Sequence, residues 1–207
     1  MNHIKFKPWV GKNYCDGFDG LRTLVLGESH YQWERNKPID NQRRLTIECI
    51  EGQLNGDCTK AFWTKIAKAM TGKKALDLDD KNKFWHSIAY YNYVQESAGF
   101  GPRCRPPGES WRRSEMPFKD TLDFLKPQFI VALGYRLWKK LPSSGYEGPG
   151  IENAKQTRTW VYPYAGGTAL LYAIKHPSSA FSPQEWHNHI VAASRQARRL
   201  NTTTNPA

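Results

Sequence analysis

Three short segments of the chain carry polar side chains suited to chemistry on a bound ligand. The first is Gly27-Glu28-Ser29-His30-Tyr31, the second centres on Asn92, and the third is His176-Pro177-Ser178. A carboxylate such as Glu28 can position water or stabilise positive charge, whereas a histidine such as His176 can donate a hydrogen bond to developing negative charge. An asparagine amide adds one acceptor and two N–H donors. We expect these groups to act in one crevice.

Predicted β-strands position the three segments. Apolar runs at residues 21–26 and 170–174 lead into the first and third segments, and Asn92 lies in a predicted strand over residues 89–95. Ligands of open α/β sheets bind outside the carboxyl ends of the strands. A fourth strand, residues 129–133, is a continuous apolar run, which is typical of a strand covered on both faces.

The alternation of short apolar runs with helical patterns predicts the fold class. We expect an α/β protein with three α-β-α layers and a central, mostly parallel four-stranded sheet. Residues 1–200 are predicted to form a single domain and residues 201–207 a disordered tail. The predicted helices cover residues 41–50, 59–70, 115–125, 135–141 and 183–199, and residues 160–164 are predicted to form a short strand or a turn.

The charge of the chain indicates its class of partner. Lys and Arg number 30 against 19 Asp and Glu, a net charge of +11, and 13% of the residues are aromatic. Basic side chains hold phosphates and aromatic rings stack on bases, so we expect a nucleic acid; the alternative is a solvated basic surface. No apolar run approaches the roughly 20 residues of a membrane span. We therefore expect a cytoplasmic, monomeric protein that binds no membrane.

Cysteine and histidine spacing does not predict a metal centre. The four cysteines, Cys15, Cys49, Cys58 and Cys104, contain no C-x-x-C pair and are expected to be reduced thiols. A zinc hydrolase that uses His187 and His189 is disfavoured, because positions i and i+2 of a helix face different directions. We expect neither a metal nor another cofactor.

Taken in chain order, these segments resemble the uracil-DNA glycosylase superfamily over residues 21–190. Residues 24–31 are similar to its first active-site motif, and residues 176–178 are similar to its second. Asn92 and residues 104–107 are similar to the base-reading asparagine and the Cys-Arg-Pro-Pro loop of its iron–sulfur branch. Residues 126–134 are similar to its third strand.

Two departures from the family pattern shape the expectation. Where the iron–sulfur branch has another cysteine after Cys104, this chain has Met116-Pro117-Phe118, so the cluster is expected to be absent. The most active uracil-specific branch has a water-orienting aspartate two residues after the motif glycine, and this chain has Ser29 there. Tyr31 matches the tyrosine that closes the pocket of that branch to a 5-substituent, but its neighbours differ. The differences at Ser29 and around Tyr31 therefore argue against plain uracil specificity.

The resemblance implies a monofunctional DNA glycosylase that takes a base out of the stack. His176 would donate to the base O2 as the base leaves, and Glu28 would position water or stabilise the sugar cation. Asn92 would read the base edge, with Gly27, Ser29 and Tyr31 forming the base pocket. No lysine is placed as an amine nucleophile, so hydrolysis without strand cleavage is expected. DNA contacts are expected from Arg103, Arg105, Arg112, Ser178 and Ser179, with Phe181 as a wedge that fills the vacated stack.

The resemblance leaves the base open. The two orientations of the Asn92 amide fit uracil and cytosine respectively. Some superfamily members defend bacteria by excising glucosylated hydroxymethylcytosine from phage DNA, and this chain resembles them in size and in its retained scaffold. We expect that activity, with loops 99–114 and 143–158 widening the pocket. The alternatives are uracil repair and a catalytically silent relative that binds nucleic acid.

Overall fold

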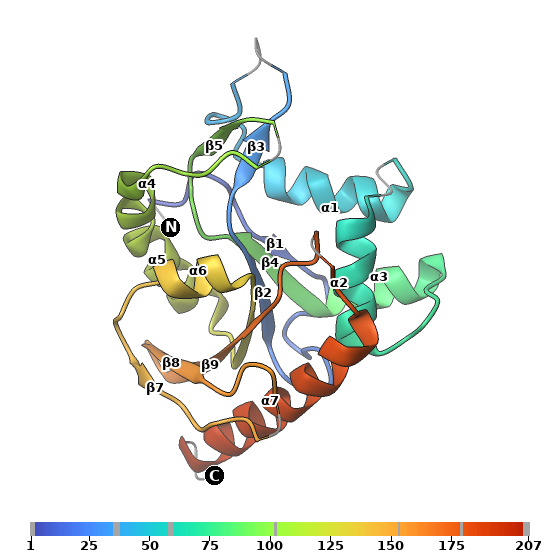
Figure 1. The fold of residues 1–207 in the computed structure, drawn as a ribbon, viewed down its shortest axis with the longest axis vertical. Helices are drawn as coiled ribbons and strands as arrows, with labels where there is room; N and C mark the ends of the chain where they lie inside the picture. Colours follow the sequence, from blue (N-terminus) through green and yellow to red (C-terminus); the bar gives the residue numbers. More distant parts are fainter. Residues whose placement is uncertain are drawn as a thin grey trace.

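The computed structural model describes residues 3–34, 38–57, 60–101, 103–152, 154–178 and 180–204. The chain forms an α/β fold around a mixed seven-stranded sheet in the order β1-β4-β2-β6-β9-β8-β7 (Figure 1). A second, two-stranded parallel sheet pairs β3 (His30–Gln32) with β5 (Ser97–Phe100). The α/β class predicted from the sequence is therefore confirmed.

Four parallel strands form the centre of the large sheet. They are β4 (Ile88–Asn92), β2 (Thr23–Gly27), β6 (Phe129–Leu133) and β9 (Gly167–Ile174). Every residue of β2, β4 and β6 is buried, because helices cover both faces. This double coverage explains the continuous apolar runs in these strands.

The prediction of a four-stranded, mostly parallel sheet is wrong, because three antiparallel strands extend the sheet at its edges. β1 (Trp9–Val10) pairs with β4, β8 (Thr159–Tyr164) pairs with β9, and β7 (Tyr146–Glu147) pairs with β8. β1 and β7 are too short to show an alternating pattern. β8 runs antiparallel because a two-residue hairpin turn joins it directly to β9, at the Tyr164–Gly167 pair.

Alternate residues of the central strands face two separate hydrophobic clusters. One face packs against α1 (Leu45–Asn55), α2 (Ala61–Thr71), α3 (Leu78–Ser87) and α7 (Pro183–Thr204). The opposite face packs against α4 (Gly108–Arg113), α5 (Glu115–Leu125) and α6 (Tyr135–Lys140). The period-two alternation of the strands thus produces three layers.

The helices differ from the sequence prediction at several points. α3 was not predicted because it is largely polar and buries only Phe84 and Trp85, although Asp77 caps it by accepting the Asp80 N–H. α1 begins at Leu45 rather than residue 41. α7 continues to Thr204, so the segment expected to be a disordered tail is helical over residues 201–204. Residues 205–207 lie outside the described residues.

Within the described part of the chain, no helix has both the length and the apolar character needed to cross a membrane.

Candidate functional site

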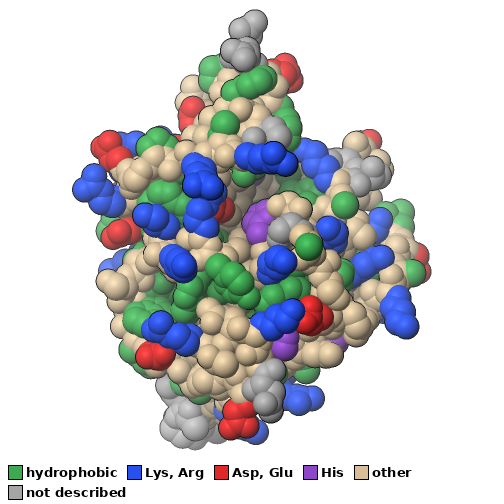
Figure 2. Space-filling model, in the orientation of Figure 1, with side chains coloured by type: hydrophobic (Ala, Val, Ile, Leu, Met, Phe, Trp, Pro, Cys, Tyr) green, Lys and Arg blue, Asp and Glu red, His purple; other side chains and the backbone are tan. Residues whose placement is uncertain are grey.

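The carboxyl ends of β2, β4 and β9 bring the three polar segments together. Gly27 pairs with Asn92 across the parallel strands, and β9 ends at Ile174, two residues before His176. Glu28, Asn92 and His176 all line one cavity with a volume of about 940 Å³. Figure 2 shows a hollow on this face, with a histidine inside it and Lys and Arg side chains around it.

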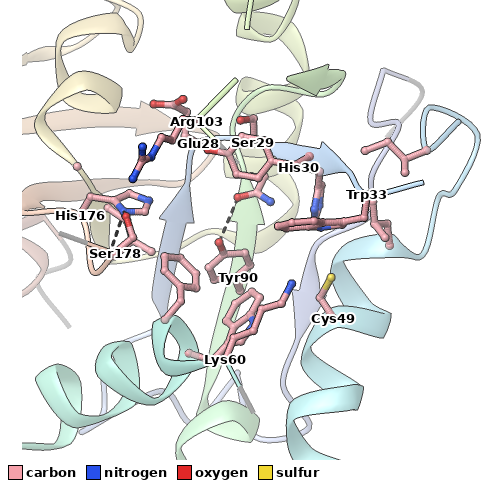
Figure 3. Close-up of a pocket in the computed structure, with 18 of the residues that line it drawn as sticks. Glu28, Ser29, His30, Trp33, Cys49, Lys60, Tyr90, Arg103, His176 and Ser178 are labelled. Carbon is pink, nitrogen blue, oxygen red and sulfur yellow. Dashed lines mark hydrogen bonds between the residues drawn. The ribbon is translucent and has the colours of Figure 1, made fainter. Parts of the chain in front are cut away.

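Most of the side chains singled out from the sequence border this cavity. Besides the three central residues, the lining includes Ser29, Tyr31, Arg103, Arg105 and Ser178. Figure 3 shows His176 and Ser178 on one side of the cavity, Trp33 and Cys49 on the other, and Tyr90 between them. The cavity is therefore a single space with two distinct walls.

Two described residues that were predicted to contact DNA, Arg112 and Phe181, do not line the cavity. Arg112 is exposed on α4 and does not line the cavity. Phe181 stacks on Trp186, with 6.2 Å between the ring centroids, and packs against a core cluster instead of projecting as a wedge. Ser179 lies outside the described residues. Phe181 is partly buried by this packing.

Asn92 is nearly fully buried and is held by its neighbour two residues earlier. The Tyr90 hydroxyl donates to Asn92 Oδ1 at 3.1 Å, which leaves the amide N–H₂ group to meet a ligand. Gly27 makes room for this pair, since a Cβ there would lie 2.1 Å from Asn92 Oδ1 and 2.3 Å from Tyr90 Oη. Gly27 thus shapes the site without lining the cavity.

His176 is held in one tautomer by the turn that follows it. The backbone N–H of Ser178 lies 3.2 Å from His176 Nδ1, and Ser178 Oγ lies 2.7 Å from the same atom. Because a backbone N–H can only donate, Nδ1 is an acceptor and the proton of the neutral ring is assigned to Nε2. Burial, with the positive charge of Arg136 as a second cause, lowers the pKa of His176. The imidazole is therefore a neutral donor through Nε2.

Packing fixes the position of the His176 ring. The ring of Phe62 on α2 lies 5.4 Å from it, centroid to centroid, and Lys65 Nζ donates to the Pro177 carbonyl at 3.1 Å. Gly134, at the end of β6, has φ of +114°, and its Cβ position lies 3.4 Å from His176 Cβ. A residue with a side chain would be strained there by the positive φ, and its Cβ would lie in van der Waals contact with the histidine.

Glu28 forms an ion pair that the sequence did not predict. Arg136 Nε donates to Glu28 Oε2 at 2.8 Å, and Arg136 Nη2 donates to Glu28 Oε1. The Glu28 side chain is only 11% exposed. Arg136 follows β6, the fourth strand predicted from the sequence, so the strand-end rule that identified the other segments also applies to this residue.

Ser29 and Tyr31 complete the wall beside Glu28. Ser29 Oγ is buried and has no hydrogen-bond partner among the described residues, so it is available to a ligand or to water. Burial and the nearby Glu28 charge raise the pKa of Tyr31, while Arg136 opposes this rise. Tyr31 is therefore a neutral hydroxyl at neutral pH.

Aromatic side chains form much of the remaining wall. Trp33 is 56% exposed and contacts Tyr31 edge to face. Lys60 Nζ lies over the Trp33 ring, 4.4 Å from its centroid. Trp33 and Lys60 both line the cavity and were not singled out from the sequence, because an isolated aromatic or basic residue carries no positional signal.

The described residues contain no group of three or more His, Cys, Asp or Glu side chains that could hold a metal ion. Cys58 lies outside the described residues. His187, considered as a zinc ligand, lies with its Nδ1 3.1 Å from the Ala69 carbonyl on α2.

Neither the models of known protein families nor the curated protein sequences match this chain.

Proposed function

We propose that this protein is a monofunctional DNA glycosylase that removes a bulky modified cytosine, such as glucosylated hydroxymethylcytosine, from phage DNA as antiviral defence. The observation that carries the proposal is the meeting of Glu28, Asn92 and a neutral His176 in one cavity at the carboxyl ends of parallel strands. These are an acid, a base-reading amide and a hydrogen-bond donor for a leaving group.

The size of the cavity supports a substrate larger than an unmodified base. Pockets for drug-sized ligands span about 300–1,000 Å³, and the volume of about 940 Å³ lies near the upper end of that range. A base held between Asn92 and His176 would leave the space toward Trp33 for a substituent. The exposed ring of Trp33 offers an apolar face against which a hexose could pack.

In the proposed reaction, the C1′–N bond breaks and the base departs with the bonding electron pair. His176 Nε2–H donates to the base O2 as negative charge develops there. A water oxygen bonds to C1′, one water proton passes through solvent to the departing base, and an abasic site remains. Glu28 holds the water and offsets positive charge on the sugar. No protein amine forms a bond with the sugar, so the DNA strand is not cut.

The charge around the cavity fits a DNA partner. Arg103 and Arg105 line the cavity and are exposed, and the net charge of the chain is +11. Flipping a base costs a few kcal/mol, which phosphate contacts and stacking must offset. We expect DNA binding to weaken steeply with salt concentration.

The direct test uses matched duplexes that contain uracil, hydroxymethylcytosine or glucosylated hydroxymethylcytosine. Alkali after incubation converts each abasic site into a strand break. Alkali-dependent breaks in the glucosylated DNA alone support the proposal, and breaks in the uracil DNA alone would replace it with uracil repair.

A catalytically silent DNA-binding protein is the second candidate. The ion pair between Glu28 and Arg136 favours it, because both oxygens of the only carboxylate in the three polar segments already accept hydrogen bonds from a guanidinium. Tight, salt-sensitive binding of all three duplexes, with no breaks after alkali, would support that candidate and exclude the glycosylase proposal.

A further inference from the structure

Arg136 lies in the first turn of α6 and lines the cavity. Its side chain is 41% exposed, yet its guanidinium turns to the nearly buried carboxylate of Glu28 at the end of β2 and makes two hydrogen bonds with it. A planar guanidinium matches a carboxylate at two points, which fixes the orientation of both groups.

We propose that Arg136 is a positioning residue that joins Glu28 and His176 into one unit: its guanidinium fixes the carboxylate and places a positive charge in the cavity that the imidazole also lines. This inference rests on the proposed glycosylase function. Neither the polar strand-end motifs nor the resemblance assigned a role to Arg136.

The ion pair defines what Glu28 can do. Both carboxylate oxygens accept hydrogen bonds from Arg136, so the carboxylate is held in one orientation. Each oxygen keeps further acceptor capacity, which allows Glu28 to hold a water molecule in a set position. Departure of the base generates a cationic sugar that reacts with such a water without prior deprotonation. Glu28 therefore acts as a fixed acceptor in the proposed reaction.

The positive charge of Arg136 also acts on His176. Among the described residues, the charged or titratable side chains around His176 include Lys65 and Lys175 beside its own segment, and the cavity-lining residues Glu28, Tyr31, Lys60, Tyr90, Arg103, Arg105, Tyr135 and Arg136. Burial lowers the pKa of His176 most, and Arg136 lowers it further. Protonation of Nδ1 would remove the acceptor for the Ser178 N–H and release the turn. Arg136 thus favours the ring form that keeps Nε2–H as the donor.

Three variants separate the charge of Arg136 from its geometry. Arg136→Gln removes both, whereas Arg136→Lys keeps the charge but loses the two-point contact. Arg158→Gln is the matched control, because it breaks a similar ion pair with Glu147 that is exposed and does not line the cavity. Base excision is measured against pH, and the His176 imidazole is titrated by NMR, with its resonance assigned from a His176→Ala sample.

We expect Arg136→Gln to raise the pKa of His176 toward 6.5, and the acid limb of the rate profile to move to higher pH by the same amount. The kcat should fall by about tenfold or more as Glu28 loses its fixed position. In Arg136→Lys the His176 imidazole should titrate as in the wild type, but kcat should be lower. Arg158→Gln should match the wild type in both measurements.

The inference is overturned if Arg136→Gln behaves like Arg158→Gln in the titration and in the rate profile. If Arg136→Gln does not fold, Arg136→Lys decides the matter. A lowered kcat of Arg136→Lys with an unchanged His176 titration would support the inference, and a wild-type kcat of Arg136→Lys would reject it. If wild-type protein excises no base from any duplex, the proposed function fails, while the NMR titration still decides whether Arg136 acts on His176.

Discussion

The carboxylate of Glu28 and the guanidinium of Arg136 form a two-point ion pair that ties the end of β2 to the first turn of α6. Glu28 is the only acidic residue in the three polar segments, and Arg136 follows a different strand, β6. Its stability and its chemistry can be measured separately.

The Glu28–Arg136 pair should contribute to folding stability. A double-mutant cycle with Glu28→Gln and Arg136→Gln, measured by urea unfolding, is expected to give a coupling of about 1–2 kcal/mol, because the carboxylate is largely desolvated. The exposed pair of Glu147 and Arg158 should give less than about 0.5 kcal/mol. Equal coupling in both cycles would contradict the assigned geometry.

His176→Ala should impair the chemical step more than DNA binding. Removing a donor that stabilises developing negative charge costs about 10²–10³ in kcat. The dissociation constant for DNA should change little, because phosphate contacts supply most of the affinity. His189→Ala is the control, since His189 contacts Trp186 outside the cavity and should keep wild-type kcat. A His176→Ala protein with wild-type turnover would remove His176 from the mechanism.

Tyr90→Phe should reduce the ability to discriminate between bases. The lost hydroxyl is the partner of Asn92 Oδ1, so the amide would turn more freely between the orientations that suit cytosine and uracil. We expect the ratio of kcat/KM values for modified cytosine and uracil to move toward one. Tyr162→Phe loses a hydrogen bond to the Pro142 carbonyl away from the cavity, and its ratio should stay at the wild-type value. An unchanged ratio in Tyr90→Phe would show that Asn92 is held by other contacts.

Buried His30 should make the fold sensitive to acid. Burial lowers the pKa of His30 to about 4, and its Nε2 lies 2.8 Å from Thr46 Oγ1. Between about pH 6.5 and 4 the unfolded chain binds a proton at this site that the folded chain does not. The free energy of unfolding should therefore fall as the pH drops through that window. In His30→Gln the decline should be shallower by up to about 3 kcal/mol. An equal decline in both proteins would exclude His30 as the cause.

The sequence predicted best the elements whose boundaries are marked by local chemistry. The apolar run of β6 and the amphipathic pattern of α5 gave both sets of bounds correctly. β1 and β7 were missed because two residues carry no periodic signal and their pairing depends on distant strands. α3 was missed because polar residues dominate it.

The same limits apply to the cavity. Glu28, Asn92 and His176 follow or end strands, so their meeting could be predicted from topology. Arg136 and Tyr90 make hydrogen bonds to Glu28 and Asn92, and the sequence does not show which side chains meet in these contacts. Phe181 was assigned to DNA as an apolar residue after an active-site segment, and its stacking on Trp186 is a contact that the sequence did not predict.

The most direct test of the account is to identify the product released from DNA that carries glucosylated hydroxymethylcytosine. Purified protein would be incubated with that duplex, and small molecules in the supernatant would be analysed by mass spectrometry, with His176→Ala as the matched control. A glycosylase of this kind should release an intact glucosylated base into solution and leave an equal number of abasic sites in uncut DNA, both strongly reduced in the variant. Tight binding of the duplex with no base in solution, or equal release by His176→Ala, would contradict the proposed function.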